Sequence, residues 1–427
     1  MVSFALNERQ EKIRQDAATV AKEVLGPSYE VYSKYPDQLS RFLSTKPFYE
    51  RLVTAGYVKA MIPKSLGGTS ESYLDMAVII EEFYAVNGCI MNHVVGTALG
   101  LLPLIIGGTP EQQQKFLAPF LSESGDAIAG LAHSEPGGTA NFLEKGGKGL
   151  GCTAKKDGDF YIINGDKLWT TNSAGWDGKG AALCLLCVRY SETGGPEDPN
   201  VDPATNIMVM AITRDIVAAN PPEAYQVLDE PDLMGYTGVT GPHTRYTNFK
   251  VPADHLLFAP DKAMDIIEKA FGVTAALVGA MALGTMREAF ERAITFSKSD
   301  SRGGSVPIIE RQSVADLLIN AKIKTDTSRL VVWKALDCLE NGPGDASSRF
   351  ESCLAAKIYA TDSALPAVFE CMQAVGMTSY ADKSGFPKLL ADAACYPLFD
   401  GGNIGIRRRQ YQRLMSSPDY KPLGSIF

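Results

Sequence analysis

The stretch GCTAKKDGDFYIINGDKLWTTNS, residues 151–173, decides the fold because its character differs from that of the chain on either side. It carries two hairpin turn pairs, Asp157-Gly158 and Asn164-Gly165, flanked by β-branched and aromatic residues. This pattern predicts β-strands that are joined by tight turns.

Further strand signals follow in the same block. The runs AALCLLCVRY (181–190) and NIMVMAITRD (206–215) read as core strands, and TRYTNFKVPADHLL (244–257) reads as a last strand ending at Pro252. We therefore expect a β-domain, a barrel or a sandwich, over residues 125–257. The C-x-x-C pair in the first run has no second Cys or His pair at metal-ligand spacing, so we expect reduced core cysteines and no metal site.

The chain before this block, residues 1–124, has a helical texture. Its first apolar periodic segment is preceded by Asn7, a suitable N-cap, and a later one begins with Thr109 as N-cap and Pro110 in the first turn. An N-terminal helical domain is expected.

The chain after the block, residues 258–427, returns to long helical patterns, which favour a packed bundle. The expected helices cover residues 266–297, 309–340 and 349–375. Pro366 falls inside the third, where a kink or break is expected. The fold class is thus α+β, with a helical domain, a β-domain and a C-terminal helical bundle.

Composition limits the possible partners. The 427 residues carry a formal net charge of −8, with a pI near 5.3, which argues against a general nucleic-acid or anionic-membrane binder. The longest apolar run, 275–286, is too short to span a bilayer. The first residues show no secretory signal, so we expect an intracellular, cytoplasmic protein, with an organelle as the alternative.

Near the end of the chain, the stretch CYPLFDGGNIGIRRRQ (395–410) places one carboxylate in an apolar, glycine-flanked setting. The neighbours Leu398 and Phe399 would raise the pKa of an isolated Asp400 by desolvation, whereas a nearby cation would lower it. A general base must be ionised at working pH, so such a pocket needs a positive group.

Three arginines follow this aspartate. If a helix starts near Asn403, Arg407 lies on roughly the same face as Asp400, and Arg408 and Arg409 rotate away. We therefore predict an Asp400–Arg407 pair, with the other two arginines as subunit or surface contacts. The alternative is a turn or N-cap role for Asp400, with solvated arginines.

The order of helices, β-block and helices, with local motifs in register, resembles the acyl-CoA dehydrogenase superfamily of FAD enzymes over essentially the whole chain. The segment GLAHSEPGGTANF (130–142) is similar to its Thr-Glu-Pro-Gly segment, which serves the polar edge of the flavin and the pyrophosphate, and glycines let the backbone approach closely. This chain departs from the pattern with Ser134 for threonine and Ala140 for serine. The FAD contacts implied here are Leu131, His133, Ser134, Thr139, Ala140 and Asn141.

A second segment, NGDKLWTTNSAGWD (164–177), resembles the family's Lys-x-Trp-Ile-Thr-Asn strand. The resemblance implies that Trp169 packs on the isoalloxazine ring, that the Thr171 hydroxyl bonds to flavin N5, and that Thr170 belongs to the same contact. The alternative is an ordinary strand with a core tryptophan.

Two further segments resemble parts that a neighbouring subunit contributes to the FAD site: SDSRGGSVPIIERQSVADLL (299–318) and MQAVGM (372–377). By this resemblance Arg302 reaches the FAD phosphate, and the chain forms a homotetramer, or a dimer, with shared FAD sites. The remaining residues carried over as FAD contacts are Gln312, Gln373, Gly376, Gly402 and Asn403.

In this superfamily the catalytic base is commonly a glutamate, with an arginine seven residues later. Here FDGG puts Asp400 at the base position and Arg407 at the arginine position, which resembles the branch that oxidises nitroalkanes. That branch has a serine bonded to its aspartate where this chain has Thr274. An N-cap role for Thr274 in its own helix is the alternative.

The resemblance implies FAD-dependent oxidation of neutral nitroalkanes by O2. Asp400 would abstract the α-proton and the nitronate would add to flavin N5, giving an aldehyde or ketone, nitrite and hydrogen peroxide. Two alternatives are an acyl-CoA dehydrogenase that passes electrons to an electron-transfer flavoprotein, and a flavin-binding scaffold without catalysis.

Overall fold

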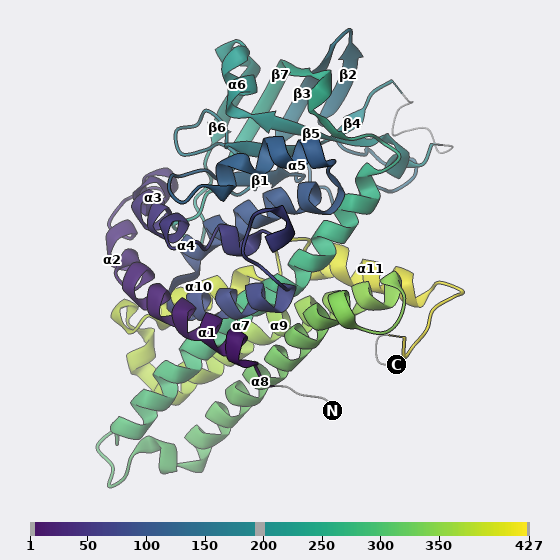
Figure 1. The fold of residues 1–427 in the computed structure, drawn as a ribbon. Helices are drawn as coiled ribbons and strands as arrows, with labels where there is room; N and C mark the ends of the chain where they lie inside the picture. The colour runs from purple at the N-terminus through teal and green to yellow at the C-terminus, as the bar shows by residue number, and fades with distance from the viewer. Residues whose placement is uncertain (1–4, 193–200, 425–427) are drawn as a thin grey trace.

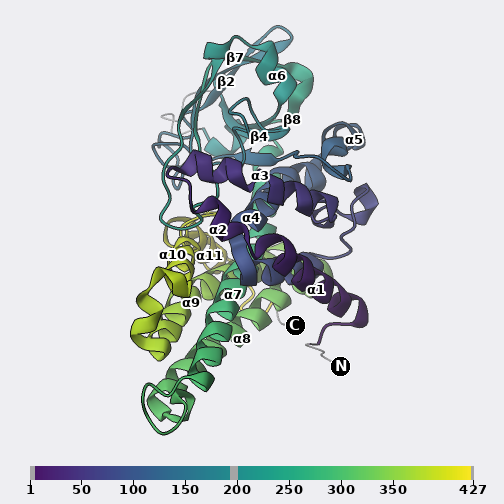
Figure 2. The same cartoon turned by 90° about the vertical axis from the view of Figure 1, so that its left-hand side faces the viewer.

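The computed structural model describes residues 5–192 and 201–424, and it confirms the α+β class (Figure 1). The sheet lies at one end of the molecule, and the C-terminal helices lie at the other. The N-terminal helices lie between them along one side (Figures 1 and 2).

The N-terminal helices begin where the capping residues predict. Asn7 and Thr109 each accept a backbone N–H through the side chain and form a capping box with a glutamine, and Pro110 is the first residue of its helix. The helices of this part are α1 (Glu8–Val20), η1 (Ala21–Leu25), α2 (Ser28–Tyr32), α3 (Gln38–Thr54), η2 (Lys59–Met61), η3 (Lys64–Leu66), α4 (Tyr73–Gly107), α5 (Pro110–Leu117) and η4 (Ala118–Leu121).

Helix α4 changes direction at Asn87, whose φ of −159° is not helical. The Asn87 side chain donates a 2.9 Å hydrogen bond to Ser28 Oγ and so fixes the bend. Beyond the bend the helix packs closely on the sheet, because a Cβ at Gly100 would lie 2.5 Å from the Gly130 nitrogen. This contact places α4 against the strand that leads into residues 133–142.

Eight strands form one sheet in the order β6-β7-β3-β2-β4-β5-β8, with β1 parallel to β4. The predicted strand up to Pro252 is present, but a further short strand follows it. The bounds are β1 (Ala129–Ala132), β2 (Thr153–Asp157), β3 (Phe160–Lys167), β4 (Leu183–Tyr190), β5 (Ile207–Thr213), β6 (Tyr225–Asp229), β7 (His243–Pro252) and β8 (Leu256–Phe258), with η5 (Pro203–Asn206), α6 (Arg214–Ala219), η6 (Pro222–Ala224) and η7 (Ala253–His255) between strands.

The sheet has a different core on each face. Leu185 of β4 faces the helices, whereas its neighbour Leu186 faces a second core inside the sheet domain. Met210 of β5 and Tyr246 of β7 belong to this second core although their strands are distant in the sheet order. The predicted barrel or sandwich is therefore a single sheet that curves around its own core.

One of the two predicted hairpin turns is present, and the prediction of the other is wrong. The turn at Asp157 and Gly158 joins β2 to β3, as predicted. Asn164 and Gly165 instead lie within β3, at an irregularity in its pairing with β7. A Cβ at Gly165 would lie 2.5 Å from Cys152 Cα, so the close approach of another segment, and not a turn, accounts for this glycine.

The three long C-terminal helices are present, and α9 continues past Pro366 without the expected break. This helix packs along both α7 and α8, and those contacts hold it together where the proline removes a backbone donor. The elements are α7 (Ala263–Ser299), η8 (Ile308–Glu310), α8 (Gln312–Asn341), α9 (Ala346–Val375), η9 (Gly376–Tyr380), η10 (Asp382–Ser384), α10 (Phe386–Cys395), η11 (Asn403–Arg407) and α11 (Arg408–Met415).

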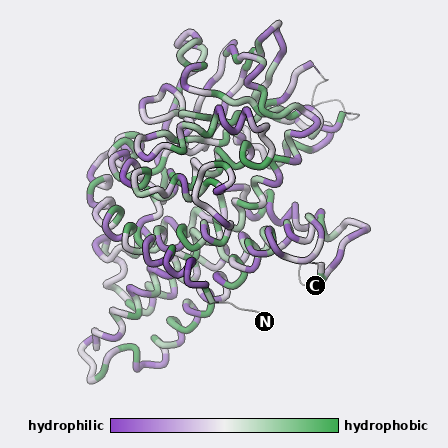
Figure 3. The backbone as a smooth tube through the Cα atoms, in the orientation of Figure 1, coloured by the Kyte–Doolittle hydropathy of each residue, from purple (hydrophilic) through white to green (hydrophobic). Residues whose placement is uncertain are grey.

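Helices α4 and α7 are long and apolar enough to cross a membrane by length and composition alone. Within the protein, however, 67% and 78% of their most apolar windows are buried, as in core helices. Hydrophilic residues prevail instead along peripheral helices such as α1 and α11 (Figure 3).

Candidate active site

Asp400 lies in the turn between α10 and η11, in a backbone conformation that is uncommon for aspartate. Its φ is +51°, and the next residue, Gly401, has a φ of +71°. The Asp400 side chain is only 6% exposed. The helical element starts at Asn403 as expected, but Asp400 lies outside it, and its position depends on the turn.

Arg407, the last residue of η11, is the predicted partner of Asp400 and makes three contacts with it. Its Nη2 lies 3.2 Å from Asp400 Oδ2, and Nε and Nη2 donate to the Asp400 carbonyl oxygen at 3.0 and 2.6 Å. The side chain is 1% exposed, and burial lowers its pKa while the charge of Asp400 opposes that shift. The guanidinium therefore fixes both the backbone and the carboxylate of Asp400.

Thr274 provides the second contact to this carboxylate. Its hydroxyl donates to Asp400 Oδ1 at 3.0 Å. The N-cap alternative is wrong, because α7 starts at Ala263 and Thr274 lies well inside the helix. Each carboxylate oxygen has two acceptor positions and uses one of them among the residues that the structure describes, so both oxygens can still accept a proton.

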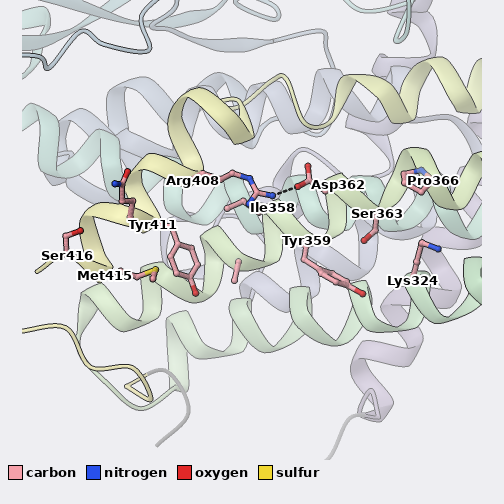
Figure 4. Close-up of a pocket in the computed structure, with 12 residues that line it drawn as sticks. Lys324, Ile358, Tyr359, Asp362, Ser363, Pro366, Arg408, Tyr411, Met415 and Ser416 are labelled. Carbon is pink, nitrogen blue, oxygen red and sulfur yellow. Dashed lines mark hydrogen bonds and ion pairs between the residues drawn. The ribbon is translucent and has the colours of Figure 1, made fainter.

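The two following arginines have different surroundings. Arg408 is half exposed and pairs with Asp362 at 2.7 Å, a surface contact as predicted (Figure 4). Arg409 instead donates to the Ala140 carbonyl and to Asn141 Oδ1. It therefore ties α11 to the segment 133–142 of the same chain.

Trp169, Thr170 and Thr171 lie in a turn just beyond the end of β3, and not on a strand. Trp169 has a φ of +69° and is 55% exposed, so the alternative of a core tryptophan is wrong. The turn is joined to residues 133–142, because Leu168 N–H donates to the Ser134 carbonyl at 2.9 Å.

Several features of these two segments fit a bound FAD. His133 Nε2 and Thr170 Oγ1 are buried and have no hydrogen-bond partner within residues 5–192 and 201–424. Burial lowers the pKa of His133 to about 3, which keeps its imidazole neutral. Gly137 and Gly138 leave open space where side chains would stand. The exposed indole can stack on a planar ring, and the unpaired polar atoms can bond to its polar edge. The open glycine pair leaves room for a phosphate group.

Of the remaining predicted FAD contacts, Gly402 and Asn403 follow Asp400 in its turn, whereas four others lie elsewhere. Arg302 follows α7 and donates to Thr378 Oγ1 at 2.8 Å, beside Gln373 and Gly376. Thr274 and the end of α7 at Ser299 are 25 residues apart, or about 37 Å along the helix axis. One chain therefore does not bring this distal set, which is Arg302, Gln312, Gln373 and Gly376, to Asp400.

Comparison with known proteins identifies the family. Residues 7–124 match the acyl-CoA dehydrogenase N-terminal domain and residues 262–415 match the C-terminal domain. The whole chain is 51% identical to a nitroalkane oxidase of Fusarium oxysporum, of which it covers 98%. The chain belongs to the nitroalkane oxidase family within the acyl-CoA dehydrogenase superfamily.

Two solved nitroalkane oxidases have the same fold over the full length of both chains. One has an active-site aspartate replaced by asparagine and was crystallized with 1-nitrooctane; it matches with a TM-score of 0.98 and 50% identity. The other is described as a flavoprotein in which an arginine and an aspartate have roles in the reaction, and it matches with a TM-score of 0.97 and 50% identity. Family membership makes this chain a flavoprotein oxidoreductase that uses FAD.

Sequence reasoning missed two groups of residues around the Asp400 turn. One is the fully buried Tyr396, whose hydroxyl bonds to those of Tyr236 and Thr285. The other is Lys357, a buried lysine beneath the turn. The only sequence signal for Lys357 was a single charge among small and apolar residues of a helix.

Proposed function

We propose that this protein oxidises neutral nitroalkanes to aldehydes or ketones, with release of nitrite and hydrogen peroxide and with Asp400 as the base. The observation that carries the proposal is the buried Asp400 carboxylate, oriented by Thr274 and Arg407. The named activity of the relatives that match over the full length supports the same substrate class.

A nitro group acidifies the neighbouring C–H bond, so a positioned carboxylate can remove that proton. Asp400 accepts the proton on either side-chain oxygen, since Thr274 and Arg407 each leave one acceptor position free. The buried guanidinium of Arg407 lies 3.2 Å from Oδ2 and places a positive charge beside the carboxylate that acts as the base.

When bound, FAD supplies the two-electron oxidation that follows proton removal, with O2 as the final acceptor. The exposed Trp169 ring offers a stacking surface, and the unpaired His133 and Thr170 atoms offer polar contacts. The residues we propose to hold the cofactor within one chain are Leu131, His133, Ser134, Thr139, Ala140, Asn141, Trp169, Thr170, Thr171, Gly402 and Asn403.

The distal set completes the cofactor site of another copy in this proposal. Arg302, Gln373 and Gly376 lie together on the surface, and the neighbouring Met377 and Tyr380 are 84% and 78% exposed. Large exposed apolar side chains beside an arginine are typical of a subunit interface. A homotetramer with shared FAD sites accounts for this arrangement.

The proposal is tested by incubating the FAD-loaded protein with nitroethane and following nitrite release and oxygen uptake together. Equal amounts of nitrite and consumed O2 are expected. A parallel assay with butyryl-CoA and an artificial electron acceptor tests the dehydrogenase alternative. Absence of nitrite from the FAD-loaded protein would refute the proposed function, whether or not the acyl-CoA is oxidised.

A further inference from the structure

Lys357, in the middle of α9, places a cation directly beneath the turn that carries Asp400. Its side chain is fully buried, and its ammonium lies 3.0 Å from Asn403 Oδ1, 3.2 Å from the Gly401 carbonyl oxygen and 3.5 Å from the Tyr396 carbonyl oxygen. These three acceptors come from the start and the end of the turn. A single ammonium thus joins both ends of the turn to α9.

Two buried cations bind the carbonyl oxygens of two consecutive residues, Asp400 and Gly401. Arg407 bonds to the Asp400 carbonyl oxygen, and Lys357 bonds to that of Gly401. Asp400 and Gly401, which carry these two carbonyls, both have positive φ. An aspartate keeps this conformation only when its surroundings determine it. Two buried charges on consecutive carbonyls supply that constraint.

Helix α9 also holds the buried Asn403, the first residue after the turn. The Asn403 amide donates to Thr361 Oγ1 at 2.8 Å and to Asp362 Oδ1 at 2.7 Å, while its oxygen accepts from Lys357. The side chain therefore has a single orientation, with its oxygen toward the ammonium. Lys357 and Asp362 together fix where η11 begins.

We propose that Lys357 is a positioning residue for the base, holding the 396–403 turn so that the Asp400 carboxylate faces its substrate. The inference rests on the proposed role of Asp400. Among the described residues Lys357 forms no ion pair, and its acceptors are all neutral oxygens. A buried charge without a carboxylate partner is costly to fold, so a role in function explains why the core contains it.

The charge of Lys357 is sensitive to pH. Burial lowers its pKa to about 7, opposed by the negative charges of Asp400 and Asp362 and reinforced by the positive charge of Arg407. An ammonium has three donors for three acceptors, whereas the neutral amine has two. The hold on the turn should therefore weaken as the pH rises through about 7.

Hydrogen exchange of the backbone amides in residues 396–403 tests this proposal without relying on activity. In Lys357→Met these amides should exchange at least about tenfold faster than in the wild type, because the turn loses its contacts to α9. The matched control is Lys324→Met, which removes the 2.8 Å ion pair between Lys324 of α8 and Glu370 of α9 and should leave the segment unchanged. Equal exchange in Lys357→Met and wild type would overturn the proposal.

A pH series tests whether the charge of Lys357, and not only the bulk of its side chain, holds the turn. After correction for the intrinsic exchange rate, wild-type protection of residues 396–403 should fall between pH 6 and 8.5, and Lys357→Met should lack that dependence. If Lys357→Met does not fold, Lys357→Gln, which keeps a neutral donor, takes its place with the same expectations. The same pH profile in wild type and variant would contradict the proposal.

Kinetics then connects the turn to the reaction. We expect kcat/KM for nitroethane, expressed per bound FAD, to fall by about 10- to 100-fold in Lys357→Met, because a base that moves by about 1 Å loses that much. Full kcat/KM in a folded variant would overturn the positioning role. If wild type releases no nitrite, the proposed function fails, whereas the exchange experiment still decides whether Lys357 holds the turn.

Discussion

Asp400 adopts a left-handed backbone conformation that is unfavourable for aspartate by about 1 kcal/mol or more. In return its carboxylate points into the protein, where Thr274 and Arg407 each bind one oxygen. A helical position for the same residue would not give Arg407 both the carbonyl and the carboxylate. The strained conformation is therefore part of how the site is built.

Replacing Arg407 by lysine should show that geometry matters beyond charge. Arg407→Lys keeps a cation but loses the planar group that bonds the carbonyl and the carboxylate of Asp400 together. We expect kcat/KM for nitroethane to fall by about 10- to 100-fold in steady-state assays. The control Arg413→Lys, on an exposed face of α11, should retain wild-type kinetics. Equal activity of both variants would contradict the role given to the guanidinium.

At the scale of the structural element, the Asp400 turn and η11 depend on each other, because Gly401 lies directly against the Arg407 side chain. A Cβ at Gly401 would lie 2.9 Å from Arg407 Nε, and the φ of +71° is itself unfavourable for alanine. Gly401→Ala should therefore lower kcat/KM by at least about tenfold, by displacing the guanidinium.

A matched glycine separates strain from contact. Gly158, in the β2–β3 hairpin, also has positive φ, but a Cβ there meets nothing within 4 Å. Gly158→Ala should lose a similar stability of about 1 kcal/mol and keep wild-type kinetics, measured by the thermal midpoint and by turnover. Similar kinetic losses in both variants would show that strain alone, and not the Arg407 contact, matters.

Elements predicted from local sequence were largely correct, and the exceptions have a common cause. Caps, long helices and the Asp400–Arg407 pair are visible in sequence because their parts lie within a few residues of one another. Lys357 was missed because its acceptors lie 39 to 46 residues away. Asn164-Gly165 was misread because a neighbouring segment, and not a turn, determines the glycine. Long-range contacts override local signals in each case.

At the scale of the whole molecule, Asp400 and Arg302 of one chain lie far apart. Asp400 contacts α7 at Thr274, and Arg302 follows the far end of that helix. If a second copy supplies Arg302, two defective variants should complement each other. Arg302→Ala and Asp400→Asn should each have low activity alone, and hybrids made by co-expression should regain part of it, because some sites combine an intact base with an intact arginine.

Nitrite release from hybrids, measured against the average of the two pure variants, checks this expectation. Activity no higher than that average would contradict shared sites. Sedimentation of the wild type decides independently whether the assembly is a dimer or a tetramer.

Buried histidines should make the whole fold sensitive to acid. Burial lowers the pKa of His93 to about 4, and the ring bonds Thr45 of α3 and Asn172 beyond β3. Because an unfolded histidine has a pKa near 6.5, the unfolded state binds the extra proton as the pH drops from 7 to 5, and stability falls by about 2 kcal/mol.

Thermal unfolding at both pH values measures this effect. The thermal midpoint of the wild type should fall more between pH 7 and 5 than that of His93→Gln, which has no proton to gain. Equal falls would contradict the assignment of a neutral His93 in the fold.

The claim that Asp400 removes the α-proton is tested most directly by giving Asp400→Asn two forms of one substrate. Neutral nitroethane must lose a proton on the enzyme, whereas its preformed nitronate anion has already lost it. We predict that kcat/KM for nitroethane falls by about 100- to 10,000-fold, while that for the nitronate stays within about tenfold of the wild type. Equal losses on both substrates, or none on nitroethane, would contradict Asp400 as the base.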